Sequence, residues 1–318
     1  MNESNSTRLR SVKGIGPKRY SSILTKLAEL RRSIDDLFQM PAVEIAATFK
    51  IPKQVAQAIS TAGDGATPPV TNSDFKILKR GTPSYPKKLE ELLADKAPTA
   101  LHVWGNLDLL NRPAVGFCGS RYATAKGIEV TADTARQIIE QGWVVVSGHA
   151  RGVDTMAHRT ALENGGSTII VAPEGISRFK LRRELKQIAK PENILIISEF
   201  EPEAGWSVGR AMARNKTIIG LSDAMILVEA RLEGGTFEAG KAALRLKVPL
   251  YVAQYQTPGE SAAGNEYFLK HGAHPLLKSS GTGKANIDHL RQTVARRDKI
   301  VVSAESPNGS SEQLLLPI

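Results

Sequence analysis

The chain has 318 residues, with 42 lysines and arginines against 32 aspartates and glutamates, so its formal net charge is +10. This length suits a sizeable core with one or two accessory modules, and clustered positive charge favours a polyanionic partner over a merely solvated basic surface. No apolar run approaches the roughly 20 residues of a membrane span, and the polar start predicts no secretory signal. We therefore expect a cytoplasmic protein without membrane association.

Residues 1–63 are predicted to form a small all-helical module. Residues 1–32 carry eight basic and two acidic side chains, and Gly14-Ile15-Gly16 is followed by Pro17 and further basic residues. Such a turn is typical of helix-hairpin-helix modules, whose N–H groups face a nucleic-acid backbone; a structural turn between two helices is the alternative. A linker rich in Gly, Ala, Thr and Pro follows at 61–69.

Residues 64–277 are predicted to form an α/β domain. Buried strands are expected at 114–118, 143–146, 168–172, 194–198, 224–229 and 249–253, with helical segments such as 125–141 and 154–164 between them. Strands that alternate with helices predict a doubly wound, mostly parallel Rossmann-like sheet covered on both faces. The pieces at 74–78, 84–89 and 101–105 are expected to pack onto the first of these strands.

Polar loops follow the carboxyl ends of the predicted strands, at 119–121, 147–152, 173–177 and 230–236. Ligands of such sheets bind beyond the strand ends where strand order reverses, so we expect these loops to converge on one crevice. The loop Gly119-Ser120-Arg121 combines open N–H groups before a helix with an arginine, which suits a phosphate. The run 178–190, with six basic residues and one acidic residue, adds charge.

Several conspicuous residues have structural explanations. Cys118 ends an apolar strand and is expected to be a buried thiol, Asp154 an N-cap, His158 a packing residue and Asp223 a turn residue. The scattered histidines predict no metal site, and no set of nucleophile and base can be found, so we predict no catalytic residue and no cofactor.

The stretch 278–318 is expected to be a poorly patterned C-terminal tail with one short helix around 286–297. Its segment 281–284 reads Gly-Thr-Gly-Lys but lacks the first glycine and the final Ser or Thr of a P-loop, which argues against an ATPase.

The chain resembles the DNA-processing protein A family, also called Smf (DprA/Smf). The resemblance rests on Gly119-Ser120-Arg121, on the segments 146–154 and 214–216, and on Gly220 to Asp223, in family order over about two thirds of the chain. It implies an extended Rossmann-like domain that forms a homodimer, binds single-stranded DNA without cleaving it, and passes the DNA to a RecA-type recombinase during natural transformation.

The planar guanidinium of arginine can donate two parallel hydrogen bonds to a phosphate. This chemistry and the resemblance together give a set of candidate residues for DNA or phosphate binding. They are Gly119, Ser120, Arg121, Ser147, Gly148, Arg151, Gly152, Arg210, Arg214, Asn215, Lys216, Gly234, Gly235 and Thr236. Lys180, Arg182 and Arg183 are expected to assist them.

The chain also departs from the family pattern. Ala211, Met212 and Ala213 stand where the family has an aromatic residue and two arginines, so Trp206 is considered as a surface for base stacking. The usual C-terminal winged helix is not recognised.

Two alternatives stay open. The loop Gly234-Gly235-Thr236 looks like the nucleotide loop of lonely-guy phosphoribohydrolases, which would make the protein a nucleotide-derivative enzyme or sensor, with Glu238 as its acidic residue and defence against foreign DNA as a setting. Glu238 lies one place early, which turns it by about 100° on a helix. The other alternative is an interaction protein that mainly dimerises or recruits partners.

Overall fold

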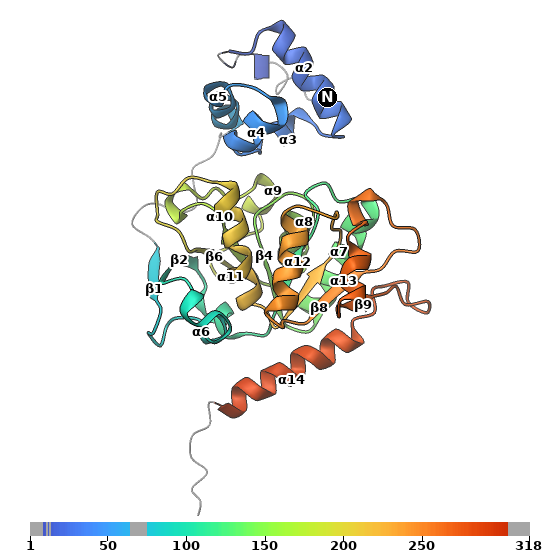
Figure 1. Ribbon diagram of the computed structural model, residues 1–318. Coiled ribbons are helices and arrows are strands. Elements are labelled where there is room, and N and C mark those ends of the chain that lie inside the picture. The colour runs from blue at the N-terminus through green and yellow to red at the C-terminus, as the bar shows by residue number, and fades with distance from the viewer. Residues whose placement is uncertain (1–8, 11, 13, 64–74, 305–318) are drawn as a thin grey trace, which may run out of the picture.

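The structure is a computed structural model that describes residues 9–10, 12, 14–63 and 75–304. Most of the predicted linker, residues 11 and 13 before the predicted hairpin turn, and the chain beyond residue 304 lie outside the described residues. Figure 1 shows a small helical unit on one side of a larger α/β domain, and a long helix near the C-terminus on the opposite side.

The helical unit contains α2 (Pro17–Glu29), α3 (Ile34–Phe38), α4 (Ala42–Phe49) and α5 (Lys53–Gly63). Tyr20, Ile23 and Leu27 recur at helical spacing on α2 and are buried, which makes one apolar face. The unit has its own hydrophobic core, in which every buried member comes from residues 9–59. We call these helices the helical module.

The α/β domain is built on a nine-stranded sheet with the order β1-β2-β6-β5-β4-β3-β7-β8-β9. The strands are β1 (Lys76–Lys79), β2 (Ala100–Gly105), β3 (Ala114–Cys118), β4 (Val144–Ser147), β5 (Thr168–Ala172), β6 (Ile194–Ser198), β7 (Ala224–Leu227), β8 (Leu250–Ala253) and β9 (His274–Leu276). From β6 through β9 all neighbours are parallel. The predicted doubly wound α/β class is therefore confirmed, with all six predicted strands present.

Two strands occupy an edge that the sequence did not indicate. We expected the segments before residue 106 to pack onto the first parallel strand, β3, and for residues 74–78 and 101–105 this was wrong. β2 instead pairs antiparallel with β6, with Val103 opposite Ile197, and β1 pairs antiparallel with β2. A pattern of buried residues reveals a strand but carries no information on which neighbour it will join.

Helices cover both faces of the sheet because the parallel strands need crossover connections. α7 (Ala125–Glu140), α8 (Val153–Glu163) and α14 (Asp288–Ala304) border one apolar cluster; α6 (Lys87–Leu93), α11 (Asn215–Gly220), α12 (Gly235–Arg245) and α13 (Asn265–Lys270) border the other. On β4, Val145 belongs to the first cluster and Val144 and Val146 to the second, as strand alternation requires. Two short helices, α9 (Arg183–Lys186) and α10 (Val208–Ala213), complete the domain.

The C-terminal helix is longer than predicted. α14 spans Asp288–Ala304, where a short helix around 286–297 was expected. Ile287, Leu290 and Val294 are buried against the sheet, so their helical spacing is what attaches this segment. Within the described part of the chain, no helix is both long and apolar enough to cross a membrane.

Asp223 is more than a turn residue. Its carboxylate accepts hydrogen bonds from the backbone N of Ala114 and from Nζ of Lys88, both at 2.8 Å. It therefore ties the start of β3 to α6. Cys118 is buried, as predicted, and its burial raises the pKa of the thiol.

Candidate nucleic-acid interface

Two neighbouring pockets lie at the carboxyl edge of the sheet. The larger, which we call the arginine cavity, has a volume of about 830 Å³ and is lined by the loops after β3, β4 and β5 and by the helical module. The smaller, the switch-point crevice, has about 320 Å³ and lies between the loops after β3 and β7. Arg121, Ala150, Ala211 and Arg214 border both pockets. The predicted loops therefore converge on one edge, but on two adjoining pockets.

The switch-point crevice lies where the strand order reverses. The chain runs outward from β3 through β4 to β6 and then returns to place β7 on the other side of β3. A crevice at that point is where doubly wound sheets bind ligands. Its two loops are tied together, because Oγ1 of Thr236 donates to the backbone O of Gly119 at 2.9 Å and the N of Thr124 donates to Glu229 at 3.0 Å.

Close backbone approach explains one glycine of the loop after β4. Gly152 has φ +71, and a Cβ there would lie 2.3 Å from the backbone O of Ser120. Only glycine allows this conformation and this contact at the same time. The start of α8 is thereby held directly against the loop that carries Arg121.

Arg214 lies buried beneath both pockets. A Cβ at Gly148 would fall 1.9 Å from Nη2 of Arg214, so this glycine makes room for the guanidinium. Nη2 lies 3.8 Å from a carboxylate oxygen of Asp154, and Nη1 donates to Asn215 at 3.3 Å. Burial lowers the pKa of Arg214 and raises the pKa of Asp154. Nε of Arg214 has no hydrogen-bond partner among the described residues.

Asp154 does not cap α8, so the sequence prediction was wrong. Gly152 occupies the N-cap position, and the Asp154 carboxylate accepts from the backbone N of Ala150 at 3.2 Å while facing Arg214. Capping and pairing with a buried cation require the same residue type, and sequence alone cannot separate them.

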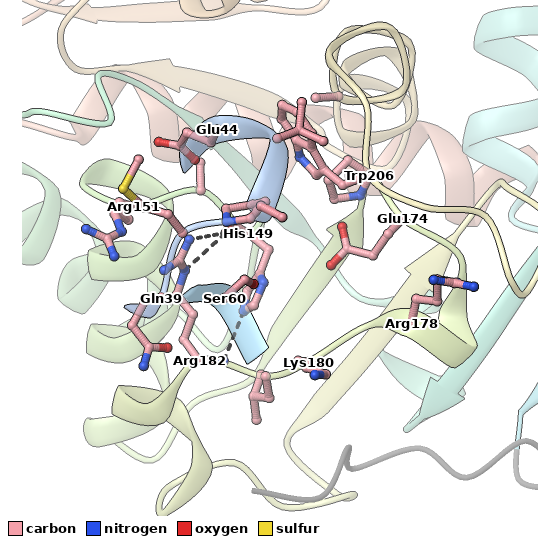
Figure 2. Close-up of a pocket in the computed structure, with 18 of the residues that line it drawn as sticks. Gln39, Glu44, Ser60, His149, Arg151, Glu174, Arg178, Lys180, Arg182 and Trp206 are labelled. Atoms are coloured by element: carbon pink, nitrogen blue, oxygen red, sulfur yellow. Dashed lines mark hydrogen bonds between the residues drawn. The ribbon is translucent and has the colours of Figure 1, made fainter. Parts of the chain in front are cut away.

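Arg182 is a central residue of the arginine cavity, although the sequence indicated only an assisting role. Its Nε and Nη2 donate to the backbone O of His149 at 3.1 and 2.9 Å, and its backbone N donates to Nε2 of the same histidine at 3.2 Å (Figure 2). Burial, reinforced by Arg182, lowers the pKa of His149 well below its usual value. The basic run 178–190 was the available signal for this residue.

The arginine cavity is strongly cationic. Eight of its lining side chains are basic and three are acidic; the basic ones are Arg121, Arg151, Arg178, Lys180, Arg182, Arg183, Lys186 and Arg214. Burial, with Arg182 and Arg32 nearby, lowers the pKa of Arg151 to about 10, and Nη2 of Arg151 has no hydrogen-bond partner in the described part of the chain. Trp206 lines the same cavity, with its ring 6.0 Å from the Arg121 guanidinium.

Three predicted site residues lie elsewhere. Arg210 donates to the backbone O of Gly205 at 2.7 Å, Lys216 is exposed on α11, and neither borders the two pockets. Ser147 is buried, and its hydroxyl donates to the backbone O of Phe117 at 2.8 Å. These three therefore do not join the cluster of arginines. Arg210 and Lys216 were selected by their position in a motif, which does not reveal the side of a helix on which they lie.

The remaining predicted residues do meet at this edge. Gly119, Ser120, Asn215, Gly234, Gly235 and Thr236 line the switch-point crevice, and Arg151 lines the arginine cavity.

The helical module supplies acidic residues that the sequence analysis did not include. Asp36 lies 3.4 Å from Nη1 of Arg151, and Glu44 lies 3.6 Å from Nη1 of Arg121. Figure 2 shows Glu44, Gln39 and Ser60 of the module around the same cavity as Arg151 and Arg182. These contacts join residues about 80 to 115 positions apart in the chain, so no local sequence pattern predicts them.

The acidic residue of the nucleotide-enzyme alternative does not join its loop, although Gly234, Gly235 and Thr236 line the switch-point crevice with Arg121. The carboxylate of Glu238 pairs with Lys241 at 2.6 Å on the surface of α12 and borders neither pocket. His158 is a buried packing residue, as predicted: Nδ1 lies 2.7 Å from the hydroxyl of Thr168, and burial lowers its pKa to about 4.

Fold and pockets together define a doubly wound α/β protein with a cationic cavity beside the crevice at its switch point. Residues 76–285 match the family described as DNA recombination-mediator protein A, and the chain belongs to that family. It is 37% identical to the DNA processing protein DprA of Streptococcus pneumoniae over 196 residues, which are 61% of this chain and 65% of the relative. It is 29% identical to the Smf protein of Synechocystis over 212 residues, 64% of this chain and 52% of the relative.

Solved structures support the same assignment. The Helicobacter pylori DNA processing protein A, whose structure was described for its single-stranded DNA binding mode, is 30% identical, with a TM-score of 0.58 over 70% of this chain and 96% of that one. The S. pneumoniae DprA structure gives a TM-score of 0.59 at 24% identity, over 85% of this chain and 94% of that one, and supports the fold. The chain spans between about half and two thirds of the length of the two curated relatives named above.

Proposed function

We propose that this protein binds single-stranded DNA without cleaving it, with the arginines at the carboxyl edge of the sheet holding the phosphate backbone. The observation that carries the proposal is the group of Arg121, Arg151, Arg182 and Arg214 around one cavity, in which Arg151 and Arg214 keep buried guanidinium nitrogens with no hydrogen-bond partner among the described residues. Buried donors of this kind match the oxygen atoms of a phosphate.

A phosphate grip predicts weak sequence preference. Phosphate contacts position a strand but do not read its bases. The DNA-binding mode described for the H. pylori relative supports a strand, rather than a free nucleotide, as the ligand.

We further propose that the protein is a homodimer located in the cytoplasm and passes the strand to a RecA-type recombinase. A helical unit at 1–63, a DNA-processing domain at 64–277 and a tail at 278–318 remain our proposed division of the chain.

The decisive experiment is a salt titration of oligo(dT) binding by fluorescence anisotropy. Arg121→Ala should weaken binding by about 5- to 10-fold and reduce the slope of log K against log salt by about 1, because one phosphate contact is lost. Arg245→Ala is the matched control: it removes one exposed arginine at the last turn of α12, roughly 15 Å along the helix from its start at the site.

Unchanged affinity and slope in Arg121→Ala would contradict the grip. Tighter binding of nucleoside monophosphates than of oligo(dT) would favour the nucleotide alternative, for which Glu238 offers no support because it faces Lys241.

A further inference from the structure

Acidic residues of the helical module form ion pairs with two arginines of the proposed phosphate grip. Arg121 and Arg151 come from the loops after β3 and β4, and each faces one carboxylate from the module, Glu44 at 3.6 Å and Asp36 at 3.4 Å. A carboxylate presents two oxygens to a guanidinium much as a phosphate does. The module thus places its own anions where a strand's phosphates would lie.

The contact is extensive enough to obstruct a strand. Phe38, Met40, Ala42 and Glu44 form part of the wall of the arginine cavity, together with residues of α5. Arg32 of the module lies over the ring of Tyr122 at 4.1 Å, next to the predicted phosphate loop. A strand that followed Arg121 to Arg151 would meet these side chains.

The contact is also built to be reversible. Nη1 of Arg32 lies 3.8 Å from one oxygen of Glu44 and Nη1 of Arg121 lies 3.6 Å from the other, so the two arginines share this carboxylate. The two ion pairs across the contact, Arg121 with Glu44 and Arg151 with Asp36, each have one partly exposed partner, and such pairs contribute little to stability. Arg151 and Arg214 also keep donors with no hydrogen-bond partner among the described residues. Bidentate phosphate contacts would satisfy these donors better.

The module can leave without losing its own fold. Its hydrophobic core is made of residues 9–59, and no residue of the sheet domain belongs to it. The capping box of α3, in which the other oxygen of Asp36 accepts from the backbone N of Ser33 at 2.9 Å, is also internal to the module. Undocking therefore exposes a surface and leaves the core of the module intact.

We propose that the helical module is an internal competitor for the DNA site: docked, its Asp36 and Glu44 occupy Arg151 and Arg121, and single-stranded DNA binds by displacing it. This inference rests on the proposed function. Only molecules with the module undocked can bind DNA, so the apparent affinity for DNA is the intrinsic affinity multiplied by the undocked fraction.

The test uses the full chain and the double substitution Asp36→Asn with Glu44→Gln. Both amides are nearly isosteric with the acids, and the amide introduced by Asp36→Asn keeps an oxygen for the α3 cap. Oligo(dT) should bind roughly 3- to 10-fold more tightly to this variant than to the unsubstituted protein, because the open fraction rises.

A control must match the change of +2 in net charge. Glu29→Gln with Glu163→Gln supplies it, since both acids are exposed and paired within their own helices, with Lys26 and with Arg159 at 2.7 Å. Equal affinities of the two double variants would overturn the competitor while leaving DNA binding in place. If neither the unsubstituted protein nor the Asp36→Asn, Glu44→Gln variant binds oligo(dT), the proposed function itself fails.

Hydrogen exchange distinguishes displacement of the module by the strand from binding of the strand beneath the module. When oligo(dT) binds the unsubstituted protein, residues 34–49, which carry α3 and α4, should exchange faster because the module leaves the cavity. Slower exchange there would mean that the strand is held beneath the module, and would overturn the proposal.

Discussion

Glu174 places a carboxyl group of the sheet domain in the wall of the arginine cavity. Burial raises its pKa to about 7, against the opposing influence of Arg214 and Arg182. The neighbouring histidines have lowered pKa values, His158 to about 4, so they stay uncharged near neutral pH. Glu174 is therefore a group of this cavity wall whose charge changes around pH 7.

Glu174→Gln should remove a pH dependence of DNA binding. In the unsubstituted protein, affinity for oligo(dT) should fall roughly 3- to 10-fold between pH 6 and pH 8, since deprotonation adds a negative charge beside the bound phosphates. The variant should bind at pH 8 as the unsubstituted protein does at pH 6. Anisotropy titrations at constant ionic strength measure this, and a slope that persists in the variant would assign the effect to another group.

Folding stability should follow the same group. A carboxyl whose pKa rises on folding holds its proton to higher pH in the folded state than in the unfolded chain, so the free energy of unfolding falls as pH increases from about 4.5 to 7. Glutamine at this position removes that contribution.

At the scale of elements, the contact between the loop after β3 and the start of α8 positions Arg121. Gly152→Ala should destabilise the protein by about 3 kcal/mol, because it combines positive φ with overlap on the Ser120 carbonyl. Gly142→Ala is the control, since Gly142 has φ +74 with nothing within 4 Å of an added Cβ, and should cost about 1 kcal/mol. Urea unfolding measures both; equal losses would show that the close approach carries no cost.

The elements also show what a sequence can reveal. Six of the seven parallel strands were predictable because each is a short buried run followed by a polar turn, whereas β9 has only three residues. Arg121 and Arg151 were predictable because they lie in those turns. β2 could not be placed, because its antiparallel partner β6 lies about 90 residues further along the chain. Asp36 and Glu44 look like ordinary helix residues in the sequence, and only the packing of the two units brings them to Arg151 and Arg121.

At the scale of the molecule, the helical module has a hydrophobic core that is separate from the clusters of the α/β domain, which predicts two unfolding transitions. All three tryptophans, Trp104, Trp143 and Trp206, lie in the α/β domain, so their fluorescence reports on that domain, whereas far-ultraviolet circular dichroism reports on both units. In a Trp206→Phe background, which removes the reporter nearest the module, the dichroism should begin to change at lower urea than the fluorescence. Coincident transitions would indicate one cooperative unit.

The carboxylates that face Arg121 and Arg151 belong to the same polypeptide as those arginines. A competitor joined by a covalent tether has an effective concentration set by geometry, which dilution does not change. The DNA concentration needed to displace the module is therefore a property of each molecule and does not depend on how many copies a cell contains. Long strands, which offer many phosphates at once, overcome such a threshold more readily than short fragments do, and the module would thus act as a filter for length.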